Sequence, residues 1–186
     1  MKTLINRLLT GKIVLLFFAV SSSLYFLMLL VTIPHLHKIT NGIKIIDMMP
    51  AGYNFEYVNQ LMEELGETGR HYYLFRQIPI DLFFPFFFAL SNCLIIAWFL
   101  KKLNRLNSQW ILACYLPFFA GFFDYAENFS VISIIINYPE LNESTIRLSN
   151  LFSIFKSSLT TISLLILLSV FLIYQFNRFS KSKQKF

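Results

Sequence analysis

The sequence predicts an all-α membrane protein, a polytopic bundle of four transmembrane helices with a short amphipathic helix in the first outer loop. The chain is 56% hydrophobic and only 14% charged, whereas about a quarter of the residues in a soluble domain are usually charged. The charged residues are missing from four long blocks rather than being diluted evenly. We therefore expect lipid to be the solvent and residues 1–186 to form a single integral membrane domain.

Each apolar block has the length of a membrane span, because about 20 helical residues cross the hydrocarbon core. The first block ends at Pro34 and is longer than the apolar core of a signal peptide, so we expect it to be retained. A helix is expected in each block because backbone groups in lipid must be paired within the segment. The predicted spans are residues 13–33, 78–100, 110–136 and 148–174.

The basic residues predict the orientation of the bundle. The first 12 residues, the loop at 101–109 and the tail after residue 174 contain basic residues and no acidic one. Segments of this kind stay on the cytoplasmic side and contact anionic headgroups. We expect an integral membrane protein with both termini cytoplasmic, in the cell membrane if the source is bacterial. The lipid bilayer, and not nucleic acid, is the partner that the net charge of +6 indicates.

Residues 54–65 predict the amphipathic helix of the first outer loop. Asn54 is a suitable N-cap and Gly66 a suitable exit. Apolar side chains recur between them at helical spacing, at Phe55, Val58, Met62 and Leu65. We expect this helix to lie on the membrane surface or across the mouth of the bundle, either as a connector or as a lid over a site.

Ionisable side chains within the spans are the strongest functional signal. Each costs roughly 2.5–3.5 kcal/mol at the centre of the membrane and so needs a partner or a purpose. Asp124, Glu127 and Asn128 are spaced i, i+3, i+4 and share a helix face, which must point into the bundle. Lys156 is the obvious cation partner, and all of these residues fall at the midplane or in the outer half. The candidate site is Asp81, Asp124, Glu127, Asn128, Lys156, Arg70 and Arg76, with Asp81 and Arg76 near the mouth.

Two interpretations of this polar group compete. In the structural one, Lys156 pairs with Asp124 or Glu127 and fixes the helix register. In the functional one, the group lines a cavity that binds a lipid headgroup, a small amphiphile or a cation, or moves protons. Three acidic residues exceed one lysine, which favours the functional interpretation. A membrane-embedded enzyme acting on a lipid-soluble substrate, and a structural or assembly subunit of a membrane complex, are the alternatives.

The sequence contains no motif that names a reaction or a cofactor. It has no phosphate-binding glycine loop, no GxSxG and no HExxH. Cys93 and Cys114 lie in apolar blocks without zinc-type spacing. His35 and His37 have no further ligand at a suitable spacing. No metal or cofactor is therefore predicted, and the sequence leaves open whether the protein is an enzyme.

Overall fold

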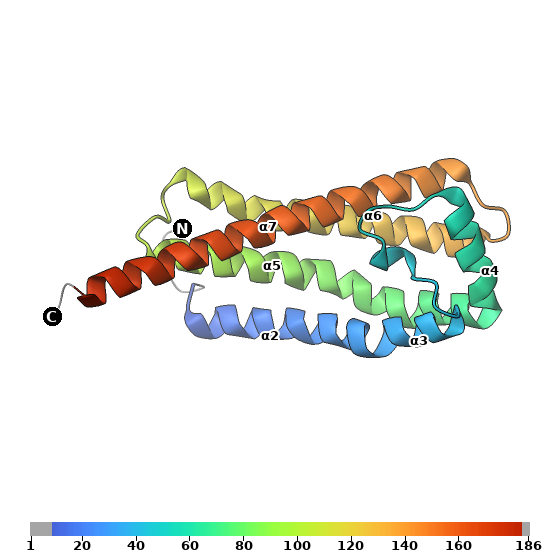
Figure 1. Ribbon diagram of the computed structural model, residues 1–186, viewed down its shortest axis with the longest axis horizontal. Helices are drawn as coiled ribbons and strands as arrows, with labels where there is room; N and C mark the ends of the chain where they lie inside the picture. Colours follow the sequence, from blue (N-terminus) through green and yellow to red (C-terminus); the bar gives the residue numbers. More distant parts are fainter. Residues whose placement is uncertain (1–8, 184–186) are drawn as a thin grey trace.

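A computed structural model describes the backbone of residues 9–183 and the side chains of residues 9–180. Within this part of the chain the protein is all-helical and has no strand. Four helical stretches in it are long and apolar enough to cross a membrane, and Figure 1 shows them packed along one axis. The four stretches are Gly11–Ile39, Phe55–Lys102, Gln109–Asn137 and Glu143–Ser180. The predicted all-α class with four apolar helices is confirmed.

The first stretch is a continuous rod made of α2 (Gly11–Leu27), a π-helical turn η1 (Met28–Thr32) and α3 (Ile33–Ile39). The hydroxyl of Thr10 caps its start by accepting a hydrogen bond from Ile13 N at 3.4 Å. The rod continues six residues past the predicted end at residue 33. The reason is that Pro34 lies in the first turn of α3, after the π-helical turn, and a proline is tolerated in the first turn of a helix.

The amphipathic helix α4 (Phe55–Tyr72) begins where the sequence predicts, with the Asn54 side chain accepting a backbone hydrogen bond at 2.9 Å. Gly66 breaks its helical backbone as the sequence predicts: with φ 57° and ψ −174° it is non-helical, and a second helical part of α4 follows it across a kink. The chain then runs through a second π-helical turn, η3 (Tyr73–Gln77), into α5 (Ile78–Lys102). Figure 1 shows α4 crossing the end of the bundle before the chain turns into α5.

The second half of the bundle contains a 3₁₀ segment, η4 (Gln109–Tyr115), followed by α6 (Leu116–Asn137) and α7 (Glu143–Lys183). Pro117 lies in the first turn of α6, directly after the junction with η4. α7 is longer than predicted at both ends, because no proline or glycine interrupts it after Asn142 caps its start. α5 is the central helix, since it packs against α2, α6 and α7.

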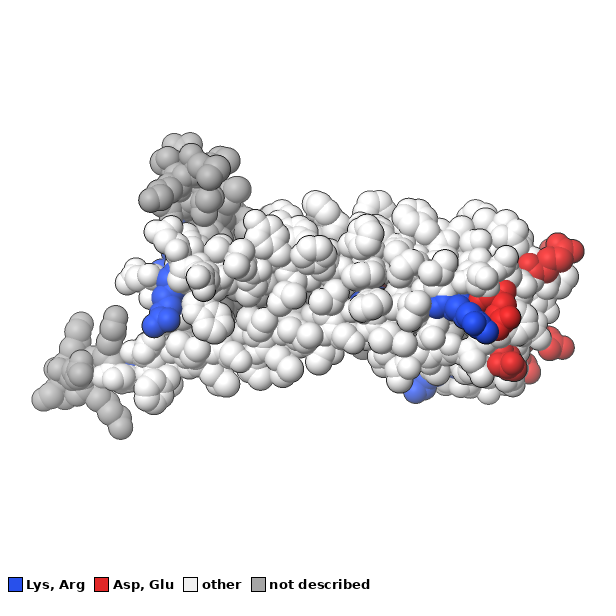
Figure 2. Space-filling view, turned by 90° about the horizontal axis from the view of Figure 1, so that it is seen from above, with Lys and Arg blue, Asp and Glu red and all other residues white. Residues whose placement is uncertain are grey.

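Charged side chains gather at the two ends of the molecule. Figure 2 shows an almost uncharged middle, a basic group at one end and a mixed acidic and basic group at the other. The first and last described residues lie at the end opposite α4 (Figure 1). Large apolar side chains such as Leu16, Phe86, Phe122 and Leu165 are exposed along the middle. An apolar belt between two charged ends is the surface that a membrane-spanning bundle presents to lipid.

Two apolar cores fill the interior. The larger core lies at the α4 end and includes Leu36, Ile46, Leu61, Met62, Ile78 and Val131. The other lies at the opposite end and includes Leu9, Ile96, Leu100, Cys114 and Val170. Asp81 follows the core residue Ile78 by one helical turn, and Asn128 precedes the core residue Val131 by one turn. The polar side chains of the spans therefore lie at the inner edge of the larger core.

Candidate functional site

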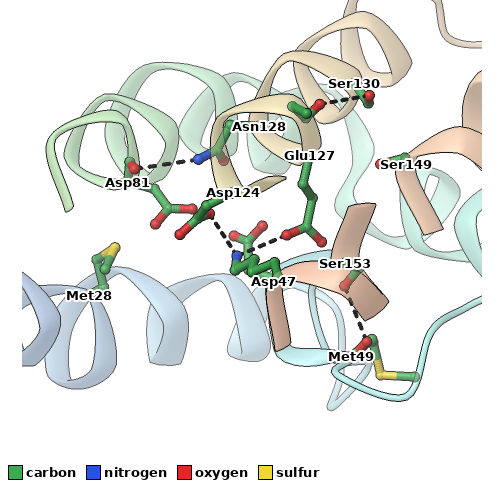
Figure 3. Close-up of polar contacts among 12 residues, drawn as sticks. Met28, Asp47, Met49, Asp81, Asp124, Glu127, Asn128, Ser130, Ser149 and Ser153 are labelled. Carbon is green, nitrogen blue, oxygen red and sulfur yellow. Dashed lines mark hydrogen bonds and ion pairs between the residues drawn. The ribbon is translucent and has the colours of Figure 1, made fainter. Parts of the chain in front are cut away.

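Four acidic side chains from separate parts of the fold converge beside Lys156, and we call them the acid cluster: Asp47, Asp81, Asp124 and Glu127. Asp47 comes from the short 3₁₀ helix η2 (Ile46–Met48), Asp81 from α5, and the other two from α6. Figure 3 shows the carboxyl groups turned toward a common centre. Asp81, Asp124 and Glu127 are 4%, 5% and 0% exposed, so bulk water does not solvate their charges.

Lys156 bridges two members of the acid cluster. Its Nζ lies 2.8 Å from Asp124 Oδ1 and 2.8 Å from Glu127 Oε2. The spacing of Asp124 and Glu127, three residues apart on α6, presents both carboxylates on one face toward α7. One ammonium group therefore joins α6 to α7 within the bundle. This contact is the pairing that the structural interpretation predicts, made with both carboxylates instead of one.

The acid cluster has more carboxyl groups than its lysine can neutralise. Within the described residues, four carboxyl groups surround one ammonium, which leaves three negative charges in excess if all are ionised. Several buried oxygen atoms also have no hydrogen-bond partner in that part of the chain: Asp47 Oδ1, Asp81 Oδ2, Glu127 Oε1 and Asn128 Oδ1. Because a buried charge without a counter-charge is very costly, the excess must be neutralised by bound protons or by a bound cation.

The two π-helical turns meet next to the acid cluster. Thr32 is the last residue of η1 and Gln77 the last residue of η3, and their side chains are hydrogen-bonded, Thr32 Oγ1 to Gln77 Oε1. The Gln77 amide also donates to Asp47 Oδ2 at 3.4 Å and lies 3.6 Å from Met28 Sδ. Gln77 therefore holds the carboxyl group of Asp47 against the bundle. π-helical turns are rare and often mark functional sites.

The loop that carries Asp47 is fastened to α7 as well. Tyr53 N donates to Asn150 Oδ1 at 2.9 Å, and the Tyr53 hydroxyl lies 2.7 Å from Ser149 Oγ. Ser153 Oγ donates to the carbonyl of Met49 at 3.4 Å (Figure 3). These bonds place the loop over the α6–α7 side of the acid cluster and close its α4 end.

Burial and neighbouring charges shift the pKa values of Asp47 and Tyr53 in this loop. Burial raises the pKa of the Asp47 carboxyl from its ordinary 3.8 to about 7; the Lys156 ammonium opposes the shift, and the Glu127 and Asp124 charges add to it. Burial also raises the pKa of the Tyr53 hydroxyl, and the negative charge of Glu127 raises it further. Asp47 is consequently neutral or ionised depending on small changes in pH near neutrality.

The structure brings together five of the seven residues that the sequence singled out: Asp81, Asp124, Glu127, Asn128 and Lys156. Asn128 Nδ2 donates to the backbone carbonyl of Asp81 at 3.4 Å, which ties α6 to α5. Asp81 is thus enclosed at the level of Asn128 rather than placed at the mouth.

Arg70 and Arg76 lie apart from the acid cluster. Arg70 Nη1 donates to the Met62 carbonyl at 2.7 Å, and its guanidinium stacks 4.4 Å from the centre of the Tyr138 ring. Arg76 is exposed. These arginines therefore supply no charge to the cluster.

Asp47, Gln77 and Tyr53 were not among the site residues predicted from the sequence. Asp47 is separated from Gln77 by 30 positions, and Tyr53 from Asn150 by 97. No local spacing connects such partners. The one signal available was that Asp47 is an isolated acid among apolar neighbours, Ile45, Ile46 and Met48.

The comparisons with known proteins add no assignment. No protein family matches the chain, and no curated protein or solved structure matches it. Among the described residues, no group of three or more His, Cys, Asp or Glu side chains is arranged to hold a metal ion. The chemistry of the site therefore has to be inferred from its own geometry.

Replacement of Asp47 by Asn tests the shifted titration. A carboxyl whose pKa is raised in the folded state stabilises the fold less as pH rises from 3.8 to about 7. Asp47→Asn should remove that part of the pH dependence. Above neutral pH its free energy of unfolding should exceed that of the wild type by at most roughly 4 kcal/mol, at ~1.4 kcal/mol per pKa unit, so the variant should unfold at a higher temperature. Thermal unfolding in mild detergent across this pH range measures it, with the exposed Glu63→Gln as control. An unchanged pH slope would contradict the shift.

Replacement of Lys156 by Met tests the bridge. The substitution leaves Asp124 and Glu127 without their counter-charge and should lower the unfolding free energy by about 3–5 kcal/mol at neutral pH. The loss should shrink in acid, because protonated carboxyl groups no longer need an ammonium partner. Denaturant unfolding at both pH values checks this, with the exposed Lys44→Met as the matched control. Equal stability of Lys156→Met and Lys44→Met would show that the bridge is not needed.

Proposed function

We propose that this chain is an integral membrane protein that binds and releases protons at the acid cluster. The observation that carries the proposal is the charge balance of a buried site: Lys156 neutralises at most one of four carboxyl groups. The other three groups can be accommodated in the bundle only when most of the excess charge is neutralised. Protons neutralise carboxylates without requiring any additional space.

The geometry supports a proton better than the other ligands that the sequence allows. A lipid headgroup or a small amphiphile needs an opening, and the three carboxyl groups on α5 and α6 are at most 5% exposed. A metal ion needs several ligands around one point, and Lys156 already occupies the position between Asp124 and Glu127. A proton needs neither.

A purely structural role accounts for less of the site. The bridge from Lys156 to Asp124 and Glu127 would by itself join α6 and α7 as polar contacts between spans do. It leaves Asp47 and Asp81 unexplained, although both carry buried oxygens without a partner in the described residues. The same two residues also favour an enzyme that acts on a lipid-soluble substrate, since a protonated buried carboxyl can serve as a general acid.

Infrared difference spectroscopy of the purified protein tests the proposal. Between mildly alkaline and mildly acidic pH, where exposed carboxylates stay ionised, the wild type should gain the carbonyl band of protonated carboxylic acid. Asp47→Asn and Asp81→Asn should each lose part of this band, whereas Glu63→Gln should keep all of it. A wild type without the band, or variants that retain it fully, would overturn the proposal. A lipid found in fixed ratio with the protein would then favour an amphiphile.

We also propose that the α4 end lies outside the membrane and that both termini are cytoplasmic. The proposal follows from the basic residues at the other end, Lys101, Lys102 and Arg105 among them. Reporter fusions after Gln60 and after Asn104 should report opposite sides, with the fusion after Asn104 on the cytoplasmic side. Reporters on the same side would contradict the four-span topology.

A further inference from the structure

A pocket opens at the α4 end of the bundle, between the start of α4 and the start of α7. Its volume is about 230 Å³, and its lining includes Glu56, Glu143, Tyr53 and Asn150. Glu143 is paired with Arg147 at 2.6 Å, whereas the Glu56 side chain is exposed at the rim. Arg147 also lines the pocket, but Glu143 balances its charge, so Glu56 leaves the pocket with a negative charge that attracts cations.

Tyr53 separates this pocket from the acid cluster. Its backbone N–H is bonded to Asn150 and its hydroxyl to Ser149, while the residue is only 8% exposed. Gly52 makes the position possible: its φ is +95°, and a Cβ built on it would overlap Asn150 Oδ1. The loop backbone therefore lies directly on α7, and the Tyr53 ring is fixed between the pocket and the interior.

Below Tyr53, one face of α7 is polar for about two turns. Ser149, Ser153 and Lys156 are spaced i, i+4, i+7, and the two serines are 0% and 2% exposed. The face ends at the contact from Lys156 to Glu127. Figure 3 shows Ser149 and Ser153 on the part of α7 that lies next to Glu127. Hydroxyl groups can donate and accept at once, so they can pass a proton along without holding a charge.

We propose that Tyr53 and its pocket are the entrance through which protons reach the acid cluster. A hydronium ion in the pocket gives a proton to Tyr53 Oη as the O–H bond of Tyr53 breaks toward Ser149 Oγ. Ser149 passes its own proton to water, and Ser153, whose hydroxyl turns away from the Met49 carbonyl, passes one on to a carboxylate of the cluster. Each hydroxyl is neutral again at the end, and one proton has moved inward. The inference rests on the proposed function, because it presupposes that the cluster takes up protons.

Measuring proton uptake after a rapid pH drop distinguishes an effect on the entrance from an effect on the acid cluster itself. Time-resolved infrared absorption of the carboxylic acid band gives both the amount of protons bound and the rate of uptake. Tyr53→Phe keeps the ring and removes only the hydroxyl. It should leave the amplitude of the band unchanged and slow the uptake roughly 100-fold or more. A positioned proton donor typically accelerates proton transfer by about 10²-fold or more.

Tyr57→Phe is the matched control. The Tyr57 hydroxyl donates to the Lys44 carbonyl at 2.6 Å near the same end of α4, and Tyr57 does not line the pocket. This variant should take up protons at the wild-type rate. Ser149→Ala keeps the Tyr53 hydroxyl but removes its partner, and should slow uptake in the same way if Tyr53→Phe does not fold.

The outcomes distinguish the two proposals. No carboxylic acid band in the wild type would defeat the proposed function. A normal band with wild-type rates in both Tyr53→Phe and Ser149→Ala would defeat the entrance alone. Equal slowing in Tyr57→Phe would also defeat it, because the effect would then belong to the loop and not to the proton path.

Discussion

The bridge between Lys156 and the carboxylates of Asp124 and Glu127 is the contact on which the interior of this bundle depends. Coulomb attraction weakens little inside a medium of low dielectric constant, so two contacts of 2.8 Å hold α6 and α7 together far more firmly than at a surface. The same medium makes every uncompensated charge costly. The bridge therefore has two effects: it stabilises two acidic groups, and it leaves Asp47 and Asp81 as the groups whose charge the fold cannot tolerate.

The irregular parts of the backbone place the remaining polar groups around this bridge. The π-helical turns η1 and η3 end at Thr32 and Gln77, and these two side chains meet next to Asp47. Each turn is followed by a proline, Pro34 or Pro79, in the next helix. A regular helix would place different residues at this level, since a π-helical turn shifts the register of everything that follows it. The kink at Gly66 has a similar effect, because its non-helical backbone lets the two helical parts of α4 run in different directions.

Local patterns in the sequence were sufficient to predict the helices and the polar face of α6. They were insufficient to predict the position of the loop that carries Asp47. Four apolar blocks and the spacing of Asp124, Glu127 and Asn128 are local features, and the structure contains both. The first helix continues past the residue at which its span was predicted to end, because Pro34 lies in the first turn of α3, just after a π-helical turn.

The contributions of Asp47 and Tyr53 depend on partners 30 and 97 positions away, and such pairs leave no trace in spacing. Arg70 shows the converse error of inference. It lies near the predicted mouth in sequence, yet the ring of Tyr138 and the carbonyl of Met62 hold its guanidinium elsewhere.

Charge balance and packing impose the same condition on the loop that carries Asp47. Ile45, Ile46 and Tyr53 are buried in or beside the larger core, so the loop cannot leave the bundle without exposing apolar surface. Asp47 must accordingly remain next to Glu127 and Asp124 whatever its ionisation state. A carboxyl that cannot move away from like charges binds a proton more readily, because the neutral form avoids their repulsion. The apolar anchors of the loop are thus what turns an ordinary aspartate into a group that responds to pH near neutrality.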